Sequence, residues 1–330
     1  MATAATPGRG RDLVVVVGGM GMDIQGRSAE AFRSGDSNPG IVTTSPGGVG
    51  RNIAENLDRL GFEVELVTAL GDDCLSRQLE EDCYDVGIGL SGAVRVAGGK
   101  SPVYLCILEP DGGFLGAVIS MEAMDGLSPD RLEERIGLLD RAWGIVVDAN
   151  VPEKSIEWIA GRYGGRGNGP LLVLDPVSVA KASRFANHLG AFDMAKPNLA
   201  EARILAGMPG EKDPATLAEA IRGKGLREIV ISLGSDGIYH QSADRSGIEA
   251  KGKISLPDTS KPDLSPRNMS GAGDAACAAL VWAFAEGLGP EDRARAALAA
   301  AMLAAASDAT VNPAISPGLL RETARSLAPR

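Results

Sequence analysis

Histidine and cysteine are scarce in this chain. Its 330 residues include two histidines, His188 and His240, and neither lies in a motif associated with catalysis or metal binding. This scarcity argues against a histidine-rich zinc site and against a mechanism built on a Ser-His-Asp or Cys-His arrangement. The four cysteines are scattered without Cys-x-x-Cys spacing, which indicates reduced thiols in a cytoplasmic protein. The chemistry must rest on carboxylates, Lys, Arg, Asn and backbone amides.

Long apolar runs and an excess of positive charge are also missing. No run reaches the roughly 18 apolar residues of a membrane-spanning helix, so we expect no membrane partner. The net charge of −10 argues against a nucleic-acid surface but leaves open the binding of free nucleosides and nucleotides. With 44% apolar and 23% charged residues, the composition is that of a globular protein.

The length allows one large α/β domain or two small ones. The first eleven residues are mostly small or polar and contain Gly and Pro, and they lack the apolar segment of a signal peptide. We therefore predict a disordered lead over residues 1–12 and a folded domain over 13–330.

Apolar, strand-like runs alternate with helical patterns along the folded region. This alternation predicts an α/β fold with a mostly parallel sheet that is covered by helices on both faces. The predicted strands are 13–17, 64–69, 144–147, 171–174 and 229–233. The predicted helices are 49–60, 129–141, 153–162, 199–206 and 215–224, and an Ala-rich helix begins after 274.

Two segments break the alternation. Residues 24–45 are polar and extended, without helical periodicity, and residues 93–120 show a strand–turn–strand pattern around Asp111-Gly112-Gly113. Together they predict a small sheet that stands off the main domain as a lid. The alternative is an extra hairpin on the edge of the main sheet.

The most informative stretch is a Gly-Ala-Gly-Asp sequence directly before the Ala-rich helix. Small residues at a helix start can point backbone N–H groups at an anion, which the helix dipole also favours. An acid beside such a pocket suits a base that takes a proton from an alcohol attacking a phosphoryl group. An ordinary glycine-rich turn is the alternative. The residues concerned are Gly271, Ala272, Gly273 and Asp274.

Two glycine-rich turns near the N-terminus follow predicted strands or precede a predicted helix. The run from Gly18 to Asp23 resembles a dinucleotide-binding turn, but no helix pattern follows it, so we favour Asp23 as an acceptor for a sugar diol. Gly47 and Gly48 would let the backbone approach a ligand, and Asn52 lies one turn into the next helix. The alternative is a helix start whose glycines only permit tight packing.

Two further clusters come at the ends of predicted strands, where α/β sheets bind ligands. Asn198 and Glu201 are three residues apart at a helix start, so they form either a capping box or a pair that holds hydrated Mg²⁺. Ser232, Gly234 and Gly237 lie in a turn that could carry a nucleotide or simply close a hairpin.

Taken in their order along the chain, these motifs resemble those of the ribokinase-like, or PfkB, family of sugar and nucleoside kinases. The resemblance covers residues 13 to about 327, and its most specific element is the Gly-Ala-Gly-Asp signature. Within the family the chain is most similar to pseudouridine kinases, because it contains an Asp-Ser-Asn-Pro-Gly stretch over 36–40 and a Gly-Gly-Val-Gly-Arg-Asn block over 47–52.

The resemblance implies a three-layer α/β/α kinase domain with a β-sheet lid. It implies that Asp274 deprotonates the ribose 5′-hydroxyl while the amides of residues 271–273 stabilise the transferring phosphoryl group. The other implied roles are ribose binding by Asp23, Gly47, Gly48 and Asn52; base recognition near Asp36, Ser37 and Thr43; contact with base or phosphates by Lys196; ATP binding by Ser232, Gly234, Gly237 and Asn312; and water-mediated Mg²⁺ binding by Asn198 and Glu201.

The resemblance also implies ATP and Mg²⁺ as cofactors, a monovalent cation such as K⁺, and a homodimer formed through the lid. The apolar strand 104–108 would profit from such cover if it were an exposed edge. The expected activity is phosphorylation of pseudouridine to pseudouridine 5′-phosphate. Another sugar or nucleoside kinase activity, or nucleoside binding without catalysis on the same fold, are the alternatives.

Overall fold

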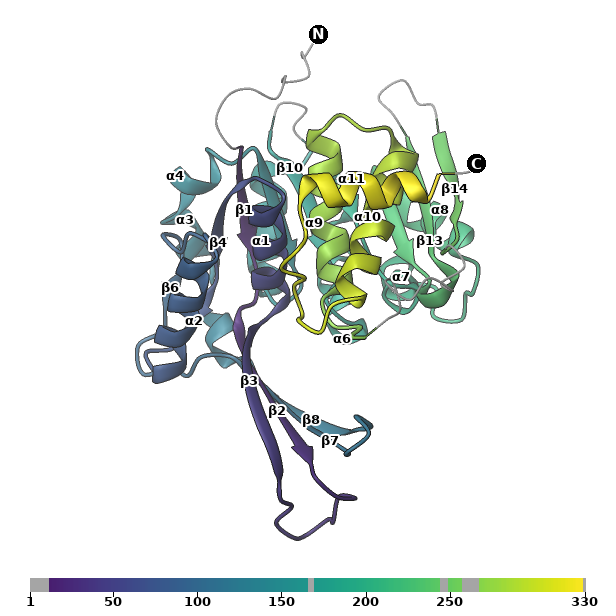
Figure 1. Ribbon diagram of the computed structural model, residues 1–330. Helices are drawn as coiled ribbons and strands as arrows, with labels where there is room; N and C mark the ends of the chain where they lie inside the picture. Colours follow the sequence, from purple (N-terminus) through teal and green to yellow (C-terminus); the bar gives the residue numbers. More distant parts are fainter. Residues whose placement is uncertain (1–11, 166–168, 244–248, 257–266, 329–330) are drawn as a thin grey trace.

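The computed structural model describes residues 12–165, 169–243, 249–256 and 267–328. Its centre is an eight-stranded sheet in the order β14-β13-β12-β11-β10-β9-β1-β4 (Figure 1). The six strands from β12 to β4 run parallel, and β13 and β14 complete one edge in antiparallel fashion. The predicted α/β fold is confirmed. The strands are β1 Leu13–Val17, β4 Glu63–Val67, β9 Gly144–Asp148, β10 Leu171–Asp175, β11 Met194–Ala195, β12 Glu228–Ser232, β13 Ile238–Ala243 and β14 Glu249–Ile254.

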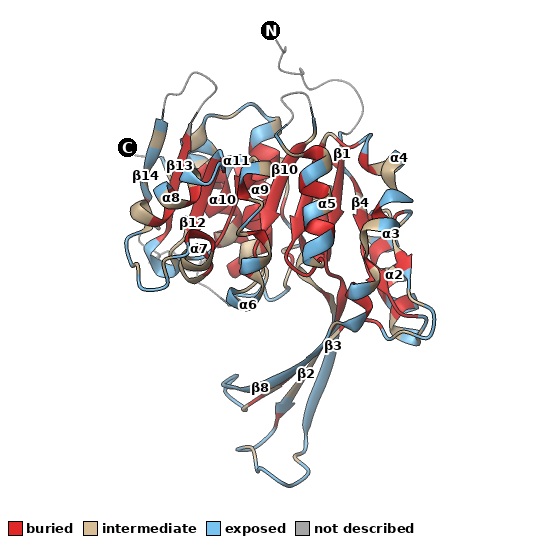
Figure 2. Ribbon diagram, turned by 180° about the vertical axis from the view of Figure 1, so that it is seen from behind, coloured by how far each residue is buried: buried red, intermediate tan, exposed pale blue. Residues whose placement is uncertain are grey.

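Alternate side chains of the strands enter two separate cores. In β1, Val14 and Val16 pack on one side of the sheet, whereas Val15 and Val17 pack on the other. Helices cover both faces, which makes three layers (Figures 1 and 2). The first core is covered by α1 Val49–Arg59, α2 Cys74–Asp85, α9 Ala272–Ala285, α10 Pro290–Ala305 and α11 Pro317–Ser326. The second face carries α3 Pro129–Glu133, α4 Ile136–Leu139, α5 Glu153–Tyr163, α6 Val179–Ala182, α7 Leu199–Ala206 and α8 Pro214–Gly223.

A second, four-stranded sheet projects from the carboxyl end of the main sheet (Figure 1). Its order is β3-β2-β7-β8, and we refer to it as the lid. The β2–β7 pairing is parallel and the two outer pairings are antiparallel. The strands are β2 Gly21–Ser28, β3 Gly40–Gly47, β7 Val103–Leu108 and β8 Phe114–Ser120. The predicted lid is therefore present as a separate sheet.

Three sequence expectations need correction. The start of the 93–120 segment is not in the lid, because β6 Val94–Arg95 pairs with β5 Ala69–Leu70. The strand expected to be an exposed edge, β7, lies between β2 and β8 and is paired on both sides. The single helix expected over 129–141 is divided into α3 and α4. The lead over 1–12 lies, apart from Asp12, outside the described residues.

In the described ranges, we find no helix that combines the length and apolarity needed to cross a membrane.

Close backbone packing joins the first strand to the first helix. Gly18 follows β1, and a Cβ atom built on Gly50 of α1 would lie 2.8 Å from the Gly18 carbonyl carbon. Gly48, at the start of α1, has φ +95° and would bring a Cβ atom within 2.6 Å of the Gly19 carbonyl oxygen. Only glycine combines this positive φ with such an approach. The contact fixes the N-terminus of α1 against the turn that leads into the lid.

We expect Gly50→Ala to lower the free energy of unfolding by about 1–3 kcal/mol. The added methyl group would overlap backbone atoms of Gly18 and Gly19, which can make room only if the whole backbone segment shifts. The measurement is urea denaturation followed by circular dichroism. Gly161→Ala in α5 is the matched control, since a Cβ atom there meets no atom within 4 Å. A Gly50→Ala protein as stable as this control would contradict the packing argument.

Candidate active site

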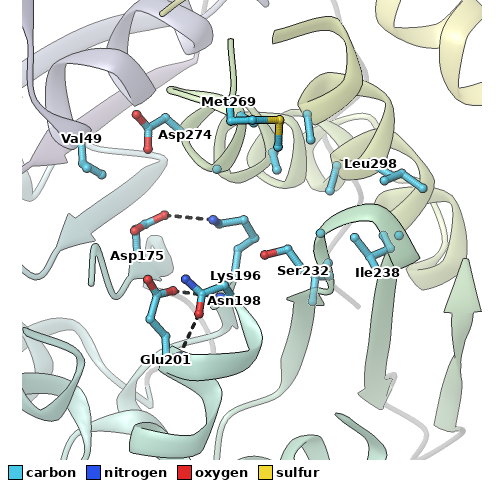
Figure 3. A pocket seen from close by; sticks show the side chains of 18 of the residues that line it. Val49, Asp175, Lys196, Asn198, Glu201, Ser232, Ile238, Met269, Asp274 and Leu298 are labelled. Atoms are coloured by element: carbon cyan, nitrogen blue, oxygen red, sulfur yellow. Dashed lines mark hydrogen bonds and ion pairs between the residues drawn. The ribbon is translucent and has the colours of Figure 1, made fainter. Parts of the chain in front are cut away.

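A cavity of about 400 Å³ lies beside the carboxyl ends of β10, β11 and β12, under the N-terminus of α9 (Figure 3). Its polar end contains carboxylates and a lysine, and its other end is lined by aliphatic side chains. The residues of the polar end are Asp175, Lys196, Asn198, Glu201, Gly273 and Asp274.

Asp274 occupies the third position of α9. The helix begins after Gly271, whose φ of +78° and close contact with the Thr310 carbonyl oxygen permit no side chain. The Asp274 side chain is buried, and its Oδ2 atom accepts a hydrogen bond of 2.8 Å from Nδ2 of Asn52. Burial raises the pKa of Asp274 to about 7, with a further increase from the nearby Asp175 carboxylate, while Asn52 and Lys196 oppose the shift. The carboxyl is therefore poised to exchange a proton near neutral pH.

Lys196 extends toward the same helix start. Its Nζ atom would lie 2.8 Å from a Cβ atom built on Gly273, and it forms an ion pair of 3.7 Å with Oδ2 of Asp175 (Figure 3). Burial alone lowers the pKa of Lys196, but Asp175 and other carboxylates outweigh it and raise that pKa. A charged ammonium group thus lies beside the N–H groups at the start of α9. Together they form a site for an anion.

Asn198 and Glu201 form a capping box, which the sequence left as one of two alternatives. Asn198 Oδ1 accepts from the Glu201 N–H at 2.9 Å, and Glu201 Oε2 accepts from the Asn198 N–H at 2.8 Å. Both residues also line the cavity. Burial raises the pKa of Glu201, partly offset by the Asn198 N–H. Capping and cavity lining are therefore compatible at this position.

The donor set here fits Mg²⁺ held largely through water. Buried Asp175 Oδ2 has no hydrogen-bond partner, and Glu201 and Asn198 add further oxygen atoms along the same wall. Hard oxygen ligands with room for water are what Mg²⁺ prefers. Within the described ranges, no three His, Cys, Asp or Glu side chains converge into a direct metal cage.

The apolar end of the cavity lies between α10 and the β12–β13 turn. Ser232, Gly234 and Gly237, which the sequence singled out, line it at the turn. Aliphatic groups form the walls, a lining that suits a flat heterocycle beside a polar tail. These wall residues are Val230, Ile238, Met269, Ala297, Leu298 and Ala301.

The predicted sugar-binding residues lie where the lid meets the domain. The Asp23 carboxylate is close to Gly47, since a Cβ atom there would come within 2.3 Å of Oδ2. Burial raises the pKa of Asp23, and Arg51 partly offsets the increase. Asp23 pairs with Ser45 and Gln25 pairs with Thr43, so Asp23 and Thr43 project from one face of the lid.

The residues predicted at the lid base and on the lid face, and Gly271, border the cavity without lining it, whereas three other predicted residues lie elsewhere. Asp36 and Ser37 are exposed in the loop that joins β2 to β3 at the far tip of the lid (Figure 1). Asn312 is absent from the cavity lining. Its Nδ2 donates to the Leu303 carbonyl near the end of α10, and its Oδ1 accepts from the Ala314 N–H in its own loop.

The sequence reading missed a polar group at the ends of β9 and β10. Fully buried Asp148 accepts from the Gly19 N–H at 2.8 Å and from the Asn150 N–H at 2.7 Å, and Lys181 donates to Asn150. Burial raises the pKa of Asp148 to about 6. Asp175 closes β10 in the same way. The sequence feature that could have identified both carboxylates is their position directly after a predicted apolar strand.

Comparison with known proteins decides the family. The model of the pfkB family carbohydrate kinases matches residues 11–316. The chain belongs to the PfkB family of carbohydrate kinases. This PfkB kinase is accordingly a phosphotransferase with an alcohol group as acceptor.

Two Escherichia coli relatives are equally similar to this PfkB kinase. A pseudouridine kinase is 32% identical over 311 residues, which cover 93% of the present chain and 95% of the relative. The uncharacterized sugar kinase YeiI is 32% identical over 321 residues, covering 97% and 84%. The fold is that of an Arabidopsis thaliana ribokinase solved with ribose and ATP, which matches with a TM-score of 0.75 and 21% identity over 96% of this chain and 99% of that chain.

The pH dependence of the kinase should report Asp274. The sequence predicts Asp274 as the base, and a base must be unprotonated, so kcat/KM is expected to rise with pH and to level off above an apparent pKa near 7. The measurement is initial rate at limiting concentrations of both substrates between pH 5.5 and 9. A profile that stays flat through this range would remove the assignment.

Removing the Asn52 donor should shift that profile. In Asn52→Leu the hydrogen bond that favours the charged carboxylate is lost, so the pKa of Asp274 and the acidic limb are expected to move to higher pH. The control is Asn56→Leu, one turn further along α1, where the amide donates to the Asn52 carbonyl rather than to Asp274. An equal shift in both variants would point to a general disturbance of α1.

Proposed function

We propose that this kinase transfers the γ-phosphoryl group of ATP to the ribose 5′-hydroxyl of pseudouridine. The observation that carries the proposal is the buried Asp274 carboxyl, hydrogen-bonded to Asn52 at the start of α9 and close to a lysine-lined anion site. The substrate itself is supported by the similarity to the pseudouridine kinase and by the 36–40 and 47–52 stretches.

The chain supplies a base and fixed positive charge. In the proposed reaction the O5′ proton passes to Asp274 as the new P–O bond forms and the bond between the γ-phosphorus and the bridging oxygen of ADP breaks. The N–H groups at the start of α9 and the Lys196 ammonium stabilise the negative charge on the transferring group. Asp23, Gly48 and Asn52 would hold the ribose hydroxyls so that O5′ points toward Asp274.

ATP would lie along the cavity, with its base against the apolar wall at Ile238 and Leu298 and its phosphates toward Lys196. Asn198, Glu201 and Asp175 would hold Mg²⁺ through water, and the ion would neutralise phosphate charge. A monovalent cation near the anion site remains part of the proposal.

Pseudouridine carries a ring N–H that uridine lacks. An acceptor aimed at this group would discriminate between the two nucleosides, since a buried unpaired N–H costs about 1–3 kcal/mol. Thr43, on the same lid face as Asp23, is a candidate. The similarity to YeiI makes another sugar or nucleoside the competing substrate class.

The lid also favours a homodimer. Seven large apolar residues are exposed on it. Exposed apolar surface of this extent in a small sheet marks an interaction site. The residues are Ile41, Val42, Leu105, Phe114, Leu115, Val118 and Ile119.

The activity prediction is tested with a substrate panel. We expect ADP release to be stimulated most by pseudouridine, less by uridine, adenosine, ribose and fructose, and the phosphate to be found at O5′ by NMR. Preference for ribose or adenosine would replace pseudouridine as the substrate.

Asp274→Asn is expected to lower kcat by about 10²–10⁴-fold, since general-base catalysis contributes on this order. Its thermal midpoint above pH 7 should not fall, because a neutral amide removes the cost of a buried carboxylate and can still accept from Asn52. ATP binding measured by calorimetry should be retained. Near-normal turnover by this variant would exclude Asp274 as the base.

A further inference from the structure

Val177 has a backbone conformation that valine rarely adopts. Among the residues that the structure describes, it is the only one other than glycine with a positive φ, at +63°. The Ser178 N–H donates to the Pro176 carbonyl at 2.6 Å, so these three residues form a γ-turn. A γ-turn with positive φ at its centre is rare and strained, and a β-branched side chain adds to the strain. Glycine would occupy this position at a lower cost in free energy.

Contacts on both sides hold the turn in this conformation. Before the turn, Asp175 Oδ1 accepts from the Val177 N–H at 2.8 Å, and the Asp175 carbonyl accepts from the Ala149 N–H at 3.0 Å. After the turn, the Arg184 side chain donates to the carbonyls of residues 149–151 at 2.8–3.3 Å. Strain of this kind persists only where the surrounding structure over-determines the backbone, and it is concentrated at functional sites.

The Val177 side chain lines the cavity at its polar end. Because the Val177 N–H is bonded to the Asp175 carboxylate, the residue lies beside the buried carboxylates and not along the aliphatic wall near α10. Oδ2 of Asp175 is buried there without a hydrogen-bond partner. Polar atoms in such a place favour water as a neighbour. An isopropyl group in the lining therefore occupies space that water would otherwise fill.

Water competes with the alcohol in phosphoryl transfer to a hydroxyl group. The Asp274 carboxylate that takes a proton from O5′ would also take one from a water molecule beside the γ-phosphate. The water oxygen would then form the new P–O bond, the bond between the γ-phosphorus and the bridging oxygen of ADP would break, and ADP and inorganic phosphate would result. A site with such a base must therefore exclude water as well as bind its substrates.

We propose that the Val177 side chain excludes water from the polar end of the cavity and thereby directs the phosphoryl group to the alcohol. The strained turn presents the isopropyl group to the cavity, which explains why valine stands where glycine would cost less. This inference rests on the proposed function, because it takes the γ-phosphate to lie at the polar end. It concerns the fate of the phosphoryl group and not the identity of the acceptor.

Two substitutions separate the side chain from the backbone strain. Val177→Ala and Val177→Gly both remove the isopropyl methyl groups, but only glycine also relieves the positive φ. Val177→Gly should therefore melt about 1–3 °C above Val177→Ala, whereas glycine at an ordinary φ melts below alanine. The measurement is the thermal midpoint by circular dichroism. A glycine variant that melts below the alanine variant would overturn the strained placement of the side chain.

The decisive measurement is ATP hydrolysis without an acceptor. Release of inorganic phosphate from ATP and Mg²⁺ should rise about tenfold in both variants, since a methyl-sized difference in a site is worth about tenfold or more in discrimination. The methyl groups that are removed leave room for water, to which Asp175 Oδ2 offers a hydrogen-bond acceptor. With pseudouridine present, both variants should release more ADP than phosphorylated nucleoside. Unchanged hydrolysis in both variants, or a rise in only one of them, would overturn the proposal.

Two controls test whether the water acts at this site. Val96 is also a partly buried valine that packs against the core on the second face of the sheet, but it does not line the cavity. Val96→Ala should lower the thermal midpoint without raising hydrolysis, and a rise equal to that of Val177→Ala would contradict a local role. Adding Asp274→Asn to Val177→Ala should return hydrolysis to the wild-type level, because the water then lacks its base. Hydrolysis that persists in the double variant would also overturn the proposal.

The acceptor-free assay separates this inference from the choice of substrate. If the wild-type chain does not phosphorylate pseudouridine while both Val177 variants hydrolyse ATP faster, the proposed substrate fails and water exclusion stands. If the wild-type chain phosphorylates pseudouridine and neither variant hydrolyses ATP faster, water exclusion alone fails.

Discussion

The site depends on one buried carboxyl group. Asp274 lies at the start of α9 with almost no contact with solvent, so its charged form loses the hydration it would have in water. The start of a helix and the Asn52 amide recover part of that loss, whereas the Asp175 carboxylate adds to it. The balance leaves the proton bound more tightly than on an exposed aspartate.

Asn52 can reach Asp274 because two backbone segments touch. Gly50 packs directly on Gly18, which brings the first turn of α1 onto the end of β1 and against the N-terminus of α9. The same turn continues into β2 and the lid. The proposed base, the proposed sugar-binding residues and the lid are thus joined through one contact that only residues without side chains permit.

Sequence patterns were sufficient for the layers of the fold and for the Gly-Ala-Gly-Asp helix start, because local periodicity and turn chemistry determine both. They did not predict the break between α3 and α4, where the Arg135 side chain donates to the Gly92 and Ala93 carbonyls on a neighbouring segment. Sequence patterns also could not predict the hydrogen bond between Asn52 and Asp274, since 222 positions separate the two residues. The α2 helix was missed although Asp73 caps it and Leu79 and Cys83 give it a buried face.

The repulsion among the carboxylates has a chemical consequence. Burial raises the pKa of Asp274 most, Asp175 and Asp148 add to the increase, and Asn52 and Lys196 limit it. A carboxylate with a pKa near 7 binds a proton about a thousandfold more tightly than an ordinary aspartate, which brings its basicity closer to that of the alcohol it must deprotonate. Greater basicity is useful only if the group is still ionised at neutral pH, so a value near 7 is close to the best compromise. The electrostatic cost that burial and this cluster impose on the folded state is therefore also the origin of the basicity that the proposed mechanism uses.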